Sequence, residues 1–343
     1  MMRFIRKGIF FIILAILLTG CSGNKELNYS KANITVIETS TFNKLSYLKL
    51  YDLDGKLIDE NKVNCVDVNS GFLSPVTYKN KVYTNSIGGY SSRSKKVLQF
   101  DLKNDSYKTY DIEYGIFTLA INDNYIFTSH SPLRGSIIKK YDIAKEKVEK
   151  ALNVPGLVEH ITFNKNLLYA FSDSDDKDGT IIISVINPDT LKIKNSIKIK
   201  SDQAVFDSVN VDNYIYFTHS ISSDEKSPSR TISRLNVNDG TINDIKLQAD
   251  YPDHIRIYKN KLYINHYNPV LNEGNKLTEL DLNGGKQKVN SFRHNISQFE
   301  IKNNKIIITD NTNIYVYDIK DFKLLCKFKV MDDRKNYRVN GFF

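Results

Sequence analysis

The chain has 343 residues, of which 41% are hydrophobic and 25% are charged, and its formal net charge is +9. This length exceeds that of an ordinary domain with one hydrophobic core, and no stretch has low complexity, so internal repetition is the first organisation to test. The Lys and Arg residues are scattered rather than clustered, which argues against a nucleic-acid partner.

Residues 1–20 have the features of a bacterial secretion signal. Three basic residues precede the apolar run 9–18, which is too short to span a membrane comfortably. Leu18-Thr19-Gly20-Cys21 follows and resembles the lipobox of bacterial lipoproteins, in which a small residue precedes a lipidated Cys. The resemblance implies that residues 1–20 are a cleaved signal peptide and that Cys21 carries the lipid. The alternative is cleavage elsewhere, with Cys21 an ordinary thiol.

Residues 21–31 then form the lipidated Cys and a polar tether. The lipid implies a membrane-anchored protein on the outer face of the cytoplasmic membrane, and the high Lys, Asn and Ile content favours a Gram-positive organism. Removing residues 1–20 lowers the formal charge from +9 to +6, which suits a protein near anionic lipids or wall polymers. Cys65 and Cys326 remain. An extracytoplasmic setting permits a disulfide, but two buried free thiols are the favoured interpretation.

From residue 32 onward, two markers recur with a period of about 44 residues. The first is an Asn that opens an apolar, often Tyr-containing strand, at positions 33, 80, 124, 166, 213, 260 and 304. The second is an apolar strand that closes on Asp or Asn, at positions 52, 101, 142, 187, 236, 281 and 318. A period of about 40–50 residues built from strands and turns is typical of a β-propeller, in which each repeat forms a four-stranded blade.

The predicted fold is therefore all-β, a seven-bladed β-propeller with four-stranded antiparallel blades over residues 32–343. Strand one of each blade is expected nearest the central channel. Six repeats have a candidate first strand, at residues 73–78, 116–121, 158–163, 206–211, 254–258 and 296–301. The repeat near Asn33 has none, whereas the terminal run Tyr337–Phe343 has no blade of its own. We expect this C-terminal strand to complete the first blade and to close the ring.

The longest insertions lie between the second and third strands, on the rim that also carries the links between blades, the usual binding face of a propeller. Arg93, Arg134 and Arg230 in these loops could meet an anionic partner or could be isolated surface charges. The acidic loop 173–179 is close to a calcium loop and to the Asp box of sialidase-type propellers. Val185 stands where a calcium loop needs Glu, and Asp178 where the Asp box has Gly, so we interpret it as a solvated loop.

Candidate site residues gather at the expected mouth of the channel. Alignment of the first strands places Glu159, Asp207 and His254 at one level, while His130, His219 and His266 lie at or near the end of second strands. Two carboxylates and an imidazole could hold a divalent metal or a cationic ligand. The alternative is a wet channel that binds only water. No nucleophile elbow, zinc-protease motif or phosphate-binding Gly loop occurs, so no residue is assigned a catalytic role and no other cofactor is expected.

Over residues 32–343 the repeat resembles the YVTN-type or quinoprotein-like bacterial propellers. The shared pattern is Asn-Lys-aliphatic-Tyr, then aliphatic-Asp, then Asn-Gly, as in Asn260–Ile264 and Leu280–Gly284. The resemblance implies the fold and leaves the activity open, because propellers host binding, lyase, lactonase and scaffold functions. The first hypothesis is a monomeric, non-enzymatic binding platform for protein, peptide or glycan. The second is a metal-dependent lyase or hydrolase, lactonase-like, at the channel mouth; a structural role in an envelope complex is a third.

Overall fold

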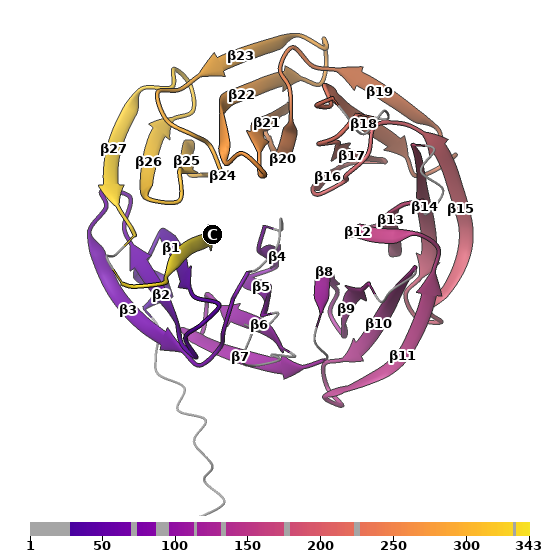
Figure 1. Ribbon diagram of the computed structural model, residues 1–343, viewed down its shortest axis with the longest axis horizontal. Coiled ribbons are helices and arrows are strands. Elements are labelled where there is room, and N and C mark those ends of the chain that lie inside the picture. The colour runs from indigo at the N-terminus through magenta and orange to yellow at the C-terminus, as the bar shows by residue number, and fades with distance from the viewer. Residues whose placement is uncertain are drawn as a thin grey trace, which may run out of the picture.

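The computed structural model describes residues 28–69, 74–86, 96–112, 115–131, 135–174, 179–222, 227–331 and 334–343. Seven four-stranded antiparallel sheets stand in a ring around a central channel (Figure 1), which confirms the predicted fold class. No helix in these ranges is long and apolar enough to cross a membrane.

Each blade runs from an innermost strand at the channel to an outermost strand at the periphery. The first three blades contain β28 (Arg338–Phe342), β1 (Ile34–Thr39), β2 (Ser46–Tyr51) and β3 (Leu57–Val63); β4 (Val76–Tyr78), β5 (Lys81–Ser86), β6 (Lys96–Asp101) and β7 (Ser106–Asp111); β8 (Ile116–Ile121), β9 (Tyr125–His130), β10 (Ser136–Asp142) and β11 (Lys147–Val154). The last four contain β12 (Leu157–Asn164), β13 (Leu167–Asp173), β14 (Thr180–Asn187) and β15 (Lys192–Lys200); β16 (Ser208–Val211), β17 (Tyr214–Thr218), β18 (Thr231–Asn236) and β19 (Ile242–Lys246); β20 (Pro252–Tyr258), β21 (Lys261–Asn268), β22 (Glu273–Asp281) and β23 (Gln287–Ser291); β24 (Gln298–Lys302), β25 (Lys305–Thr309), β26 (Asn313–Asp318) and β27 (Leu324–Lys329).

The recurring Asp and Asn have a common structural role. In all seven blades this side chain accepts backbone N–H groups of the turn between the third and fourth strands, as Asp281 Oδ1 does from Asn283 at 2.8 Å and Gly284 at 3.2 Å. This side-chain-to-backbone bonding stabilises tight turns. In six blades the recurring Asn lies in or beside the turn between the first and second strands, where Asn166 and Asn304 adopt positive φ, whereas Asn33 directly precedes β1. The markers are therefore turn residues.

The apolar core lies between the blades. The second and third strands are buried on both faces, whereas outermost strands such as β15 are largely exposed. Apolar clusters join neighbouring blades, so that Leu50 of the first blade and Phe100 of the second share one cluster. Because each sheet is covered by its neighbours, the ring buries apolar surface that a single blade would expose.

The C-terminal strand closes the ring as predicted. β28 pairs with β1 as the innermost strand of the first blade, and Phe343 exchanges two backbone hydrogen bonds with Thr35, at 2.9 and 3.0 Å. Residues 29–31, at the end of the expected tether, form the short 3-10 helix η1 (Tyr29–Lys31). The ring of Tyr29 is buried against Phe100 and Phe343, with centroids 6.4 and 6.5 Å away. Both ends of the described chain are thus packed on the first two blades.

Candidate functional site

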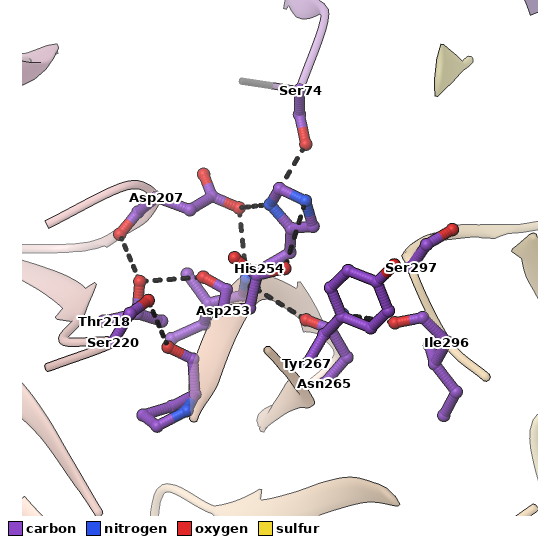
Figure 2. A network of polar contacts seen from close by, with 12 residues as sticks. Ser74, Asp207, Thr218, Ser220, Asp253, His254, Asn265, Tyr267, Ile296 and Ser297 are labelled. Atoms are coloured by element: carbon purple, nitrogen blue, oxygen red, sulfur yellow. Dashed lines mark hydrogen bonds and ion pairs between the residues drawn. The ribbon is translucent and has the colours of Figure 1, made fainter. Parts of the chain in front are cut away.

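A buried charged network occupies the channel between the fifth, sixth and seventh blades. Oδ2 of Asp207 lies 3.4 Å from Nδ1 of His254 and 2.6 Å from Nη1 of Arg256, from which it accepts a hydrogen bond. Nε2 of His254 lies 3.5 Å from Oδ2 of Asp253. Figure 2 shows the His254 ring beside Asp207, with Ser74 approaching the same nitrogen of the ring. The structure therefore brings together two of the predicted residues, Asp207 and His254.

Ser74 connects this network to the opposite side of the channel. It precedes β4 in the second blade, yet its Oγ lies 3.3 Å from Nδ1 of His254 and accepts a hydrogen bond from Nη2 of Arg256 at 3.0 Å. The guanidinium also donates to Oε1 of Glu300, from Nε at 2.8 Å and from Nη2 at 2.6 Å. A cavity of about 520 Å³ lies beside these residues and reaches Tyr78 at the far end of β4.

The charges of the network perturb one another. Burial alone would raise the pKa of Asp207, but Arg256 and His254 hold it well below its ordinary value. For His254 burial acts in the opposite direction, and the carboxylates of Asp253 and Asp207 outweigh it, so the pKa of His254 is raised. Burial raises the pKa of Asp253 to about 6. Two flanking carboxylates stabilise the protonated form of His254, which disfavours a role as general base.

Glu159 does not join the network. β12 ends at Asn164, one residue later than the predicted strand 158–163, so His160 rather than Glu159 is level with Asp207 and His254. Oε2 of the buried Glu159 accepts the N–H of Val205 at 3.0 Å, and burial together with nearby Asp173 raises its pKa well above the usual range. His160 lines the cavity instead, with Nε2 2.8 Å from Oγ of Ser208.

The histidines at the ends of the second strands lie inside their own blades. Nε2 of His219 is 2.7 Å from Oγ of Ser233, and Nε2 of His266 is 2.7 Å from Oγ1 of Thr278, each on the neighbouring third strand. His130 contacts Thr128 of its own strand at 2.8 Å. Burial lowers the pKa of His219 and of His266 to about 4. The three contacts hold these imidazoles in the blades, away from the Asp207 network.

The described ranges contain no group of three or more His, Cys, Asp or Glu side chains that is arranged to hold a metal ion. Cys65 and Cys326 are both free thiols, as the favoured interpretation had it, although Cys326 is only partly buried. Arg230 pairs with Asp250. Cys21, Arg93, Arg134 and most of the acidic loop lie outside the described residues.

The central residues of the network, Arg256 and Glu300, escaped the sequence analysis, although a signal for them was present. Each lies two residues before the end of its first strand, Arg256 before Tyr258 and Glu300 before Lys302. Opposite charges at the same level of neighbouring blades indicate an ion pair between those blades. The Ser74 contact had no such signal, because the second and sixth blades are far apart in sequence.

Comparison with known proteins shows the fold. No protein-family model matches the chain, and no curated protein matches it. Among solved structures, a functionally unknown protein from Desulfotomaculum acetoxidans aligns over 90% of this chain and 99% of its own, with a TM-score of 0.62 and 12% identity. The Pan2 WD40 domain of Neurospora crassa aligns over 82% of this chain and 87% of its own, with a TM-score of 0.53 and 11% identity. This chain is a seven-bladed β-propeller.

The exposed apolar residues of the propeller are unevenly placed. We call the edge formed by connections between second and third strands and by links between blades the loop rim, and the opposite edge the turn rim. Ten large hydrophobic side chains of the described ranges are exposed, and five of them belong to outermost strands. The other five all lie on the loop rim: Phe42, Leu157, Ile221, Val270 and Leu271.

Val270 and Leu271 are the most exposed of these five side chains, at 82% and 63%, and they form the tip of the β21–β22 connection. Their backbone N–H groups donate to Oδ1 of Asn268 at 2.9 and 3.1 Å. Asn295 donates to the carbonyl of Asn272 at 3.0 Å and ties the connection to the next blade link. Two apolar side chains are thus presented to solvent on a hydrogen-bonded turn.

Proposed function

We propose that this protein is a membrane-anchored extracytoplasmic lipoprotein whose propeller is a binding platform for a protein, peptide or glycan partner. The observation that carries the proposal is that, among the described residues outside the outermost strands, the exposed large apolar side chains all lie on the loop rim. The adjacent Val270 and Leu271, the most exposed of these side chains, favour an interaction surface on this rim, and the burial of such side chains favours a protein or peptide. The similarity to a WD40 domain fits a binding role at the level of the fold.

The position of the N-terminal segment supports a specific orientation on the membrane. The N–H of Ser30 donates to Oδ1 of Asp105 at 3.1 Å, and Asp105 lies in the β6–β7 turn, on the turn rim. The seven residues between Cys21 and Tyr29 span at most about 25 Å when extended. A lipid on Cys21 would therefore keep the turn rim towards the outer face of the cytoplasmic membrane and leave the loop rim facing away from it.

Under the same proposal, the protein is a monomeric propeller of the YVTN type from a Gram-positive bacterium. The geometry of the described network does not favour the alternative of a metal-dependent lyase or hydrolase. Asp207 already has two cationic partners, and Glu159 is directed elsewhere. Binding at the rim is therefore the function that the structure supports best.

Site-specific photo-crosslinking in the native host tests the binding platform. A benzophenone side chain at position 271 would probe the loop rim, and one at position 284 of the same blade would probe the turn rim, where Gly284 is exposed and has free space around it. We expect a discrete adduct from position 271 that is absent from position 284. Equal labelling from both positions, or no adduct from position 271, would refute a loop-rim partner.

Metabolic labelling tests the anchor independently. A palmitate analogue should be incorporated into the wild-type chain and not into Cys21→Ser, which should also leave the membrane fraction. Labelling that persists in Cys21→Ser would show that the lipobox interpretation is wrong.

A further inference from the structure

The cavity in the central channel has an asymmetric wall. Its volume of about 520 Å³ is within the range of small-molecule sites. Asp207, Arg256 and Glu300 supply charge from the fifth to seventh blades, whereas Thr77, Thr118 and Thr162 supply neutral hydroxyl groups from the second to fourth. No lysine is among the described residues that line it.

The positive charge of the wall has no free hydrogen-bonding capacity. A guanidinium has five N–H donors, and all five of Arg256 are used within the protein. Nη1 donates to Asp207 and to the carbonyl of Ile255, Nη2 to Ser74 and Glu300, and Nε to Glu300. Burial lowers the pKa of His160, the other basic side chain of the wall, to about 4, so it is neutral. An anionic ligand would find no available cationic donor.

The negative charge of the wall is still available. Both hydrogen bonds from Arg256 go to Oε1 of Glu300, and among the described residues none donates to Oε2. The Glu300 side chain is 31% exposed and lines the cavity. Half-buried Phe163 and Phe206 also line the space. A carboxylate together with aromatic rings is the combination that attracts organic cations.

We propose that the central cavity binds a small molecule carrying a protonated amine, with the ammonium paired to Oε2 of Glu300. Arg256 is a positioning residue for this site, because its two bonds to Oε1 fix the carboxylate and leave Oε2 directed to the ligand. The site is separate from the loop rim, so it does not depend on the proposed rim partner.

Titration calorimetry on the full-length protein in mild detergent tests this site. The probes are the amines cadaverine, ethanolamine and N,N-dimethylethanolamine, with 1,5-pentanediol as the neutral match of cadaverine and glutarate as the anionic match. We expect at least one amine to bind with Kd below about 1 mM, and the diol and the diacid not to bind. Binding of glutarate or pentanediol as tight as that of cadaverine, or binding of none of the three amines, would overturn the proposal.

Glu300→Gln locates the site within the protein. The amide oxygen can still accept from Arg256, so the variant is expected to fold, and loss of the charge should weaken amine binding about tenfold. Glu273→Gln is the matched control, because Glu273 is exposed on β22 and does not line the cavity. Equal amine affinity in Glu300→Gln and Glu273→Gln would contradict binding at Glu300. If Glu300→Gln is unstable, the comparison of amine and diol binding to the wild-type protein still decides the question.

Discussion

The buried ion pair that holds the closing strand in place allows a quantitative prediction. Nζ of Lys49 on β2 lies 3.2 Å from Oε2 of Glu38 on β1, and both side chains are almost fully buried, at 2% and 0% exposure. Arg334, just before β28, donates to the same oxygen at 2.7 Å and also pairs with Glu60. Glu38→Gln would remove the charge that compensates a buried ammonium. Breaking a buried pair on one side costs about 3–5 kcal/mol.

Urea denaturation followed by far-UV circular dichroism measures this cost. Glu38→Gln should lower the free energy of unfolding by about 3–5 kcal/mol. Glu146→Gln, which breaks the exposed pair with Lys108, should lower it by about 1 kcal/mol or less. The double variant Glu38→Leu/Lys49→Met should cost less than the sum of its single changes, because it leaves no unpaired charge. Equal midpoints for Glu38→Gln and Glu146→Gln would refute the reasoning.

Three further predictions follow from the blades and the ring closure. The pKa of His219 is lowered to about 4 in the folded protein, whereas the unfolded chain binds this proton near pH 6.5. Acidification from pH 7 to 5 therefore lowers the free energy of unfolding. His219→Gln should therefore lose less stability than the parent over that interval, and identical pH profiles would contradict this. Cys326 should react with a thiol reagent in the native protein. Cys65 is buried, with its pKa raised to about 11, and should react only after unfolding. Fast labelling of both thiols in the native protein would contradict this prediction. Deletion of residues 338–343 should abolish the cooperative unfolding transition and expose the first blade to limited proteolysis, whereas Phe343→Ser should only shift the midpoint; a deletion variant that unfolds like the parent would show that β28 is dispensable.

The architecture could be predicted from the sequence because it is set by local signals repeated seven times. The Asp and Asn markers are the residues whose side chains bond the turns, so their spacing counts the blades directly. The missing first strand near Asn33 and the unassigned run at the C-terminus predicted the closing strand, since an innermost strand cannot be absent from one blade alone. The side-chain bonds of a turn and the apolar pattern of a strand each involve only a few consecutive residues, so they can be recognised in the sequence.

The channel could not be predicted to the same depth, because its contacts join residues far apart in the chain. Asp207 and His254 were placed correctly relative to each other by counting from the turns. The same count misplaced Glu159 by one residue, because β12 ends at Asn164 rather than Phe163, and His160 lines the cavity instead. Sequence determined the ring and its closure. Only the tertiary structure decided which side chains meet across the channel, because that depends on the exact end of each first strand, on Ser74 approaching from the opposite blade, and on the saturation of Arg256.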